Sequence, residues 1–305
     1  MTLPPNMPRT GLWVNGLDLQ PPTMVAELAA ELEATGLGAI WLSEGLAHDP
    51  FVTAAGLLAA TRSLVVGTGI AVIYGRHPHW MRASARAVLD AHPGRFLFGL
   101  GTSNPLVVEE VLGLEYRKPL AALGEYLDEL DQPDALRGRL GLPDPGPLPR
   151  VLAALGPRAL RLAADRANGA ITYLVPPEHT SQAREILGPE RALVVEQAVV
   201  VGIDDDSART RARAHVGAYL SNPGYRDSWR RLGFTDADLA GTGSDRLLDA
   251  LVAVGQDEVD RRVAAHLAAG ADHVCLQALP AEPFTIPVEQ WKLLSSMEIG
   301  HPAGR

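Results

Sequence analysis

The chain has 305 residues, of which 47% are hydrophobic, so it can bury a sizeable core and suits one large α/β domain over residues 1–305. Its net charge of −9 argues against a nucleic-acid partner, and no apolar run approaches the ~20 residues of a membrane-spanning helix. The single cysteine, Cys275, excludes an internal disulfide framework, which fits a reducing compartment, so we expect a cytoplasmic protein.

The first half of the chain alternates short apolar runs with helical patterns. Apolar runs predict strands over residues 12–15, 39–42, 64–69 and 96–100. Helical spacing of apolar residues between them predicts helices, the first capped by Thr23 and ended by Gly36. The four strands are therefore expected to run parallel, each followed by a crossover helix.

The second half continues the alternation after a loop over residues 141–147. Strands are expected over residues 151–154, 170–173, 193–201 and 273–277, and residues 208–269 are expected to form several helices. Eight strands alternating with helices predict an α/β fold of the (β/α)8 TIM-barrel class with helical insertions. A doubly wound open sheet is the alternative.

Polar side chains follow several of these strands, at the end where parallel α/β folds bind ligands. Glu44 follows the second strand and could hydrogen-bond a ligand or move a proton, although a loop acid in that place could simply be solvated. Thr102 and Ser103 follow the fourth strand, and could either bind a ligand or form an ordinary turn. Asn15 and Tyr173 end the first and sixth strands and are further candidates for the pocket lining.

Gly156-Pro157-Arg158 opens a helix and predicts an anion site. Proline suits the first turn of a helix, where free backbone N–H groups attract anions. Arg158 lies where the helix dipole disfavours a cation, which a bound phosphate would explain; the alternative is a surface arginine.

Other polar groups are interpreted as structural. Basic residues gather around one helix, and we expect a solvated helix face there; they are Arg76, His77, His79, Arg82 and Arg86. No spacing of histidines and acids resembles a metal site, so no metal is expected. Cys275 is expected to be a small core residue.

Several motifs together resemble the bacterial luciferase-like monooxygenase superfamily. They are Gly67-Thr68-Gly69-Ile70, Pro93-Gly94-Arg95-Phe96 and Gly99-Leu100-Gly101-Thr102-Ser103. The subset of this superfamily that uses the deazaflavin coenzyme F-420 is resembled by Ala154-Leu155-Gly156-Pro157-Arg158, Glu178-His179-Thr180 and Gly270-Ala271-Asp272-His273-Val274.

The resemblance implies a TIM barrel that holds a flavin or deazaflavin at the carboxyl ends of its strands and forms a homodimer. It implies a bulge with a cis peptide bond between Gly69 and Ile70. The side chain of Ile70 would press on the back of the ring. Glu44, Thr102, Ser103 and the Gly156-Pro157-Arg158 segment are then the expected cofactor contacts, with Glu44 also the expected catalytic acid.

The sequence departs from the family pattern at two places. Sugar-phosphate dehydrogenases of the deazaflavin subset follow the acid with a histidine, where this chain has Gly45, and carry a glutamate where this chain has Asn104. We therefore expect hydride transfer between coenzyme F-420 and another small molecule. An FMN-dependent monooxygenase and a catalytically silent flavin-binding barrel are the alternatives.

Overall fold

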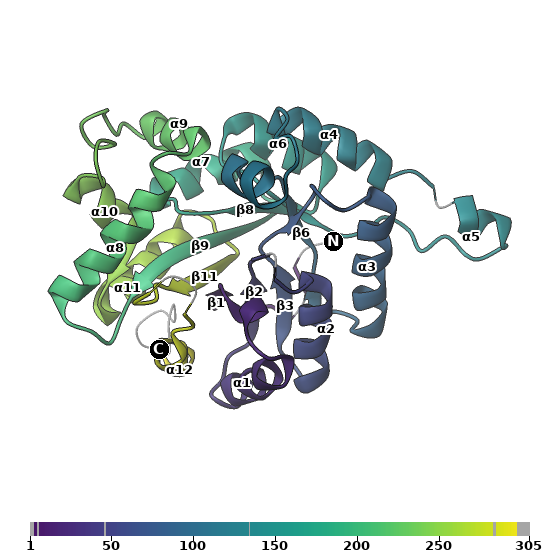
Figure 1. The fold of residues 1–305 in the computed structure, drawn as a ribbon, viewed down its shortest axis with the longest axis horizontal. Coiled ribbons are helices and arrows are strands. Elements are labelled where there is room, and N and C mark those ends of the chain that lie inside the picture. The colour runs from purple at the N-terminus through teal and green to yellow at the C-terminus, as the bar shows by residue number, and fades with distance from the viewer. Residues whose placement is uncertain (1–2, 5, 46, 134, 283–284, 298–305) are drawn as a thin grey trace.

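A parallel sheet curled into a barrel forms the centre of the protein in a computed structural model, which describes residues 3–4, 6–45, 47–133, 135–282 and 285–297 (Figure 1). Its strands are β1 (Thr10–Val14), β2 (Ala39–Leu42), β3 (Val65–Thr68), β4 (Ala71–Val72), β5 (Phe96–Leu97), β6 (Gly99–Gly101), β7 (Val151–Ala153), β8 (Gly169–Thr172), β9 (Ala192–Val200), β10 (Val252–Val254) and β11 (His273–Ala278).

The strand pairing shows how the sheet closes. Hydrogen-bonded neighbours follow the order β4-β6-β7-β8-β9-β11-β1-β2-β3-β5. Because β4 continues β3 after a two-residue interruption and β6 continues β5, both ends of this order belong to the same two long strands, which pair with each other as β3 with β5 and β4 with β6. The expected TIM-barrel class is confirmed.

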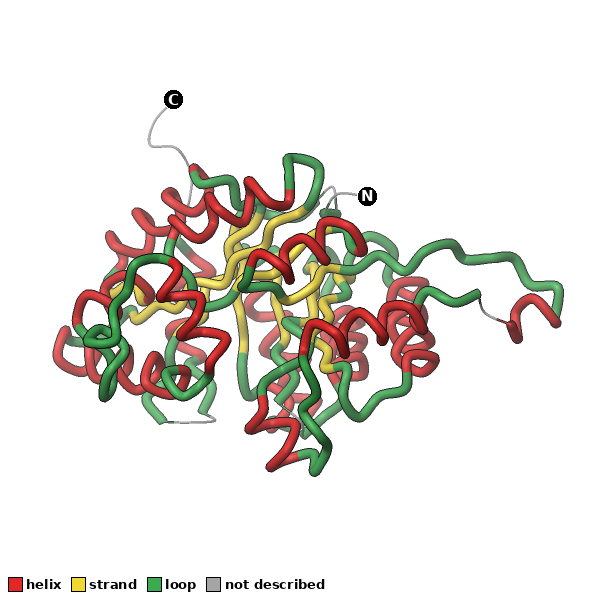
Figure 2. Tube along the Cα trace, turned by 90° about the horizontal axis from the view of Figure 1, so that it is seen from above, coloured by secondary structure: helices red, strands yellow, loops and turns green. Residues whose placement is uncertain are grey.

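Helices cover the outside of the barrel, as the tube view shows (Figure 2). They are α1 (Pro22–Ala34), α2 (Pro50–Ala60), α3 (Pro78–Ala91), α4 (Pro119–Leu130), α5 (Ala135–Arg139), α6 (Pro157–Arg166), α7 (Pro177–Leu187), α8 (Asp205–Tyr219), α9 (Pro223–Arg231), α10 (Asp245–Leu251), α11 (Gln256–Ala268) and α12 (Val288–Ser296), with a 3-10 turn η1 (Leu17–Leu19) and a π-helical segment η2 (Leu106–Val111). Many of these helices start at a proline. Proline suits the first helical position because a backbone N–H group there would have no partner within the helix. None of the described helices is long and apolar enough to cross a membrane.

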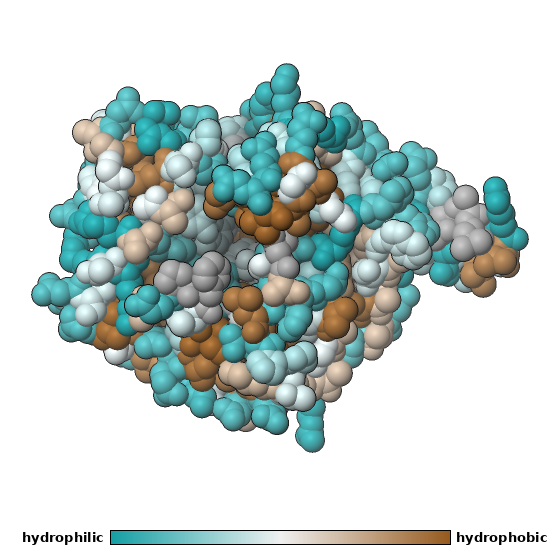
Figure 3. Space-filling view, in the orientation of Figure 1, coloured by the Kyte–Doolittle hydropathy of each residue, from teal (hydrophilic) through white to brown (hydrophobic). Residues whose placement is uncertain are grey.

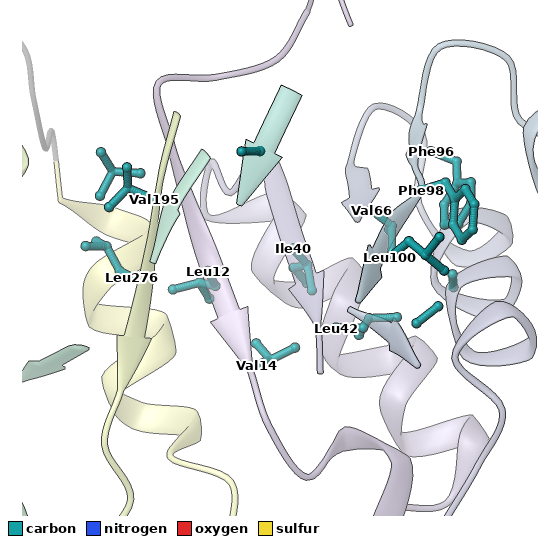
Figure 4. Packing of buried hydrophobic residues seen from close by; sticks show 14 of the residues in the cluster. Leu12, Val14, Ile40, Leu42, Val66, Phe96, Phe98, Leu100, Val195 and Leu276 are labelled. Atoms are coloured by element: carbon teal, nitrogen blue, oxygen red, sulfur yellow. The ribbon is translucent and has the colours of Figure 1, made fainter. Parts of the chain in front are cut away.

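Side chains on the outer face of the strands pack against these helices and make the main core. Leu12 and Val14 of β1 point outward beside Ile40 and Leu42 of β2, and Leu276 continues the layer (Figure 4). Alternate residues of the same strands point inward, because successive side chains of a strand face opposite sides. The barrel therefore has an outer apolar layer and a separate interior.

Tryptophans and glycines fill the interior as matched pairs. Trp41 packs on Gly67, where a Cβ atom would lie 2.5 Å from the indole ring, and Trp13 packs in the same way on Gly69. Gly67 and Gly69 on either side of Thr68 therefore leave room for two indole rings. Cys275 belongs to this interior cluster and is fully buried, so the interpretation of it as a core residue is confirmed.

The long strand β9 has two different partners along one edge. Residues 192–195 pair with β8, whereas residues 198–200 pair with β10. β10 was not predicted, because its three residues, Val252–Val254, follow helix α10 without a break. The segment between β9 and β10 contributes α8, α9 and α10, which pack as a second apolar cluster around the buried Trp229.

An arm between α4 and β7 projects from the body and carries α5 (Figure 1). Arg82 donates to the Leu130 carbonyl at 3.3 Å at one root of the arm, and Arg86 donates to the Gly146 carbonyl at 2.9 Å at the other. The expectation of a solvated helix face is therefore wrong for these two arginines, because backbone carbonyls of the arm take up their donors. The tip is hydrophobic where Leu140 and Leu142 are exposed (Figure 3).

Two expected helix ends have different outcomes. α1 starts at Pro22, so Thr23 lies inside the helix, and no side chain caps it. Gly36 follows the helix with a φ of 104°, a left-handed conformation that favours glycine, as expected for a stop.

Candidate functional site

A cavity of about 610 Å³ lies at the carboxyl ends of the barrel strands. Asn15 follows β1, Ser43 follows β2, and Tyr173 follows β8, and all three line it. One wall comes from α8 and α9, the helices inserted between β9 and β10. The cavity thus occupies the place where parallel barrels bind ligands. Asn15 and Tyr173, the two further candidates for the pocket lining, both line it.

The interruption between β3 and β4 faces this cavity. The Gly69–Ile70 peptide bond is cis, as the family resemblance implied, and both residues line the cavity. A side chain at position 69 would lie 2.5 Å from the Trp13 ring, so the bulge and the indole fit only around glycine. Ile70 therefore presents its branched side chain at the floor of the cavity beside Trp13.

The turn after β6 also faces the cavity. Thr102, Ser103 and Asn104 line it, and Ser103 has a φ of 56°, which is uncommon outside glycine. Tyr116 donates from its hydroxyl to the Ser103 carbonyl at 3.3 Å. The Asn104 side chain accepts from the Val107 N–H at 3.1 Å at the start of η2, so it acts as a helix cap.

The N-terminus of α6 opens into the same cavity. Gly156 is the N-cap and makes no side-chain cap, Pro157 is the first helical residue, and Gly156 and Arg158 line the cavity. Arg231, which no sequence pattern indicated, comes from α9 and brings a guanidinium nitrogen 3.6 Å from where a Cβ atom of residue 156 would lie. Neither Arg158 nor Arg231 makes a hydrogen bond or ion pair within the described part of the chain, which leaves two cations beside free helix N–H groups.

The Glu44 carboxylate makes its hydrogen bonds with residues that do not line the cavity. Its Oε2 accepts from the Val72 N–H at 2.6 Å, and its Oε1 pairs with Arg76, which also contacts Asp49 at 2.9 Å. Burial raises the pKa of Glu44, and the Val72 N–H and Arg76 oppose this. The carboxylate thereby holds β4 directly after the Gly69–Ile70 bulge. Glu44 is not among the residues that line this cavity, and its role as a catalytic acid stays a prediction.

The departure from the family pattern at Gly45 has a steric reason. A Cβ atom at position 45 would lie 2.5 Å from a carboxylate oxygen of Asp18. Asp18 is buried and accepts from the Ala47 N–H at 3.0 Å. A side chain at position 45 would therefore displace Asp18, so the histidine of the sugar-phosphate enzymes does not fit this loop as it stands.

Aromatic residues from the inserted helices form the remaining wall. Tyr219 of α8 and Tyr225 of α9 line the cavity beside Tyr173, with the Tyr219 and Tyr225 ring centres 4.8 Å apart. No sequence signal pointed to them, because they lie far along the chain from any barrel strand end. Their positions flanking Asn222-Pro223-Gly224, a helix break, are the one local feature that brings both to one surface.

A buried carboxyl group lies on β9, the strand that pairs with β8. Glu196 of β9 is fully buried, its Oε2 accepts from the Leu174 N–H at 2.8 Å, and its Oε1 has no partner among the described residues. Burial raises the pKa of Glu196 to about 8, so the group is mostly protonated at neutral pH. Leu174 itself has a φ of 54°, the second such non-glycine residue in the described chain.

Comparison with known proteins gives consistent matches. Residues 6–279 match the model of a family described as luciferase-like monooxygenase. A protein of Mycobacterium tuberculosis named as a coenzyme F420-dependent oxidoreductase is 26% identical over 90% of this chain and 96% of its own length.

Solved structures share the fold. An F420-dependent secondary alcohol dehydrogenase in complex with an F420-acetone adduct has a TM-score of 0.71 at 15% identity, covering 98% of this chain and all of that one. The oxygenating constituent of 3,6-diketocamphane monooxygenase of Pseudomonas putida, in complex with FMN, has a TM-score of 0.66 at 14% identity, covering 94% and 96%. At such identities these likenesses concern the fold alone.

Proposed function

Because this chain belongs to the luciferase-like monooxygenase family and is an enzyme of that class, we propose that it uses the deazaflavin coenzyme F-420 to transfer hydride to or from a small molecule. The observation that carries the proposal is one cavity with two complementary ends. Ile70 and Trp13 form an apolar floor at the strand ends, and Arg158 and Arg231 lie beside the N-terminus of α6. The Mycobacterium tuberculosis relative, by its name, supports the choice of cofactor.

The residues present fit a deazaflavin with a phosphate-bearing side chain. Two arginines without a described partner and a helix N-terminus without a side-chain cap suit a phosphate, since both supply donors and positive charge. Ile70 offers a rigid apolar surface for the tricyclic ring, and Thr102 and Ser103 offer hydroxyls and backbone groups at its edge. When bound, the coenzyme supplies the hydride.

The protein's own part is to bind, orient and exclude water. The Gly69–Ile70 bulge is held from behind by Trp13, and β4 is held by the Glu44 carboxylate. Residues of α8 and α9 form one wall of the cavity, and the buried Trp229 of α9 donates from its indole N–H to the Leu174 carbonyl at 3.2 Å. We propose that Glu44 acts through this support of the bulge.

The first test is the choice of cofactor. We expect purified protein to bind coenzyme F-420 at least tenfold more tightly than FMN, measured by fluorescence titration with each. Equal affinity or a preference for FMN would instead favour an FMN-dependent monooxygenase. If neither binds, the silent barrel is the better description.

The second test removes the arginines. Arg158→Ala should weaken coenzyme binding by about tenfold or more, because a charge-assisted hydrogen bond contributes roughly 1.5–3 kcal/mol. Arg231→Ala should do the same, whereas Arg161→Ala on the same helix α6, at a position that does not line the cavity, should have no effect.

A fragment of the coenzyme without its phosphate provides the control. Its affinity should change little in either variant, because the lost contact is with the phosphate. If coenzyme and fragment weaken equally, the arginines act through the fold and the anion site is refuted.

A further inference from the structure

The aromatic half of the cavity has a geometry that the proposed cofactor site does not use. Tyr173, Tyr219 and Tyr225 contact one another by their rings, with Tyr173 and Tyr219 centres 5.5 Å apart and Tyr173 and Tyr225 centres 6.2 Å apart. Trp13, in the floor of the proposed cofactor site, borders this group with its ring centre 5.3 Å from that of Tyr173. Tilted and edge-on contacts of this kind hold aromatic rings in fixed orientations. The three tyrosines therefore form one continuous aromatic surface.

The tyrosine hydroxyls of this surface differ in whether they have a hydrogen-bond partner. Tyr219 donates to the Tyr173 oxygen at 2.9 Å, and Tyr173 donates to Oε1 of Gln277 at 2.8 Å. The protons of these two hydroxyls are therefore committed within the protein. The Tyr225 hydroxyl has no hydrogen-bond partner within the described ranges, although its side chain lines the cavity.

Tyr225 packs against the buried Trp229 of its own helix. It lies one turn before Trp229 on α9, with the two rings 5.8 Å apart, and Trp229 is fully buried. Burial raises the pKa of Tyr225 far above its ordinary value, with the neighbouring Tyr219 adding to this, so the hydroxyl stays protonated at neutral pH. A protonated phenol without a protein acceptor can donate to a ligand.

We propose that Tyr225 donates a hydrogen bond to the carbonyl oxygen of a flat, conjugated substrate that packs against Tyr173 and Tyr219. Flat rings can stack on the rings of the aromatic wall. The carbonyl oxygen accepts from the Tyr225 hydroxyl, the one hydroxyl of this wall that has no partner in the described ranges. The inference rests on the proposed function, because a hydride donor reduces electron-poor carbonyls and conjugated double bonds. A donor at the oxygen withdraws electrons from the carbon that accepts hydride.

The test uses prodan, a neutral naphthyl ketone whose emission moves to longer wavelength when its carbonyl accepts a hydrogen bond. Prodan is titrated into the protein alone and into protein saturated with coenzyme F-420. We expect saturable binding in both cases. Tyr225→Phe should weaken binding by about two- to tenfold, the effect of one neutral hydrogen bond, and should shift the emission of bound prodan to the blue.

Tyr116→Phe is the matched control, because Tyr116 lines the same cavity but its hydroxyl already donates to the Ser103 carbonyl. It should leave affinity and emission unchanged, and both variants should keep the wild-type thermal midpoint. The proposal is overturned if prodan fails to bind, if it competes with the coenzyme, or if Tyr225→Phe binds it as the wild type does. An equal blue shift in both variants would overturn it as well.

Failure of the proposed function is recognised separately. If coenzyme F-420 does not bind in its own titration while prodan responds to Tyr225→Phe as expected, the donor site is supported and the cofactor assignment falls.

Discussion

Glu196→Gln should stabilise the protein at pH 7 by roughly 3 kcal/mol, because wild-type folding must protonate a buried carboxyl group. The pKa of Glu196 is raised from 4.5 to about 8 by burial inside the barrel. At neutral pH the unfolded chain carries this group ionised, whereas the folded chain carries it protonated. Glutamine is neutral in both states and keeps an oxygen to accept from the Leu174 N–H.

The pH dependence gives the sign of this effect. Since the folded pKa lies above the unfolded one, the wild-type free energy of unfolding should lose about 1.4 kcal/mol for each pH unit between about 4.5 and 8 through this group. Urea unfolding of both proteins from pH 5 to pH 8 measures it. The two curves should converge towards pH 5 and separate as the pH rises. Parallel curves would show that Glu196 does not titrate in this range.

Glu33 provides a control of opposite sign. Its carboxylate accepts from the N–H groups of Arg62, Ser63 and Leu64, and these bonds lower its pKa to about 2 against the opposing effect of burial. Its stabilising contribution is present above pH 4.5 and is lost as the pH falls towards 2. Glu33→Gln should therefore destabilise the protein at neutral pH. The buried histidines titrate equally in all three proteins and cancel in the differences.

The second large effect is expected at Gly99, the first residue of β6, which lies very close to the end of β3. A Cβ atom there would lie 1.9 Å from the Thr68 carbonyl oxygen, which is backbone and cannot rotate away. The Thr68 hydroxyl also accepts from the Gly99 N–H and donates to its carbonyl, both at 2.8 Å. Gly99→Ala should therefore lower the free energy of unfolding by about 3 kcal/mol or more.

Gly56→Ala is the matched substitution. Gly56 lies within α2, and its Cβ atom would meet nothing within 4 Å, so alanine should raise the free energy of unfolding by about 1 kcal/mol. Denaturant unfolding measures both variants. If Gly99→Ala were as stable as the wild type, the close approach of the two strands would be wrong.

The barrel could be predicted from the sequence because its signals are local. Each strand is a short apolar run and each helix has its own period, so β1, β2, β3, β7, β8, β9 and β11 were predicted near their observed bounds, and β5 with β6 was predicted as one strand. β4 has two residues and was not predicted as a strand. The cis bond at Gly69–Ile70 was implied by the family resemblance. β10 was missed because it is three residues long and follows a helix directly.

The site was predicted only where it belongs to strand ends or to a helix start. Ile70, Ser103 and Arg158 line the cavity because the fold places such positions at the same rim. Arg231 and Tyr225 reach it through the packing of α9 on the barrel, which depends on contacts between distant residues and leaves no spacing pattern. The partner of Glu44 was missed for the same reason, since Arg76 lies 32 residues away.

The change of partners along β9 has a consequence for how this protein can diversify. β8 leaves one edge of β9 and β10 takes up the same edge a few residues later, so α8, α9 and α10 begin and end at fixed points of the sheet. The ring of barrel strands and the residues Gly156–Arg158 lie outside this segment, whereas Arg231, which lies beside Gly156, belongs to it. Exchange of this stretch would therefore leave Gly156, Pro157 and Arg158 of α6 in place but would remove Arg231 of α9. A replacement segment that keeps the proposed phosphate site has to supply a cation of its own.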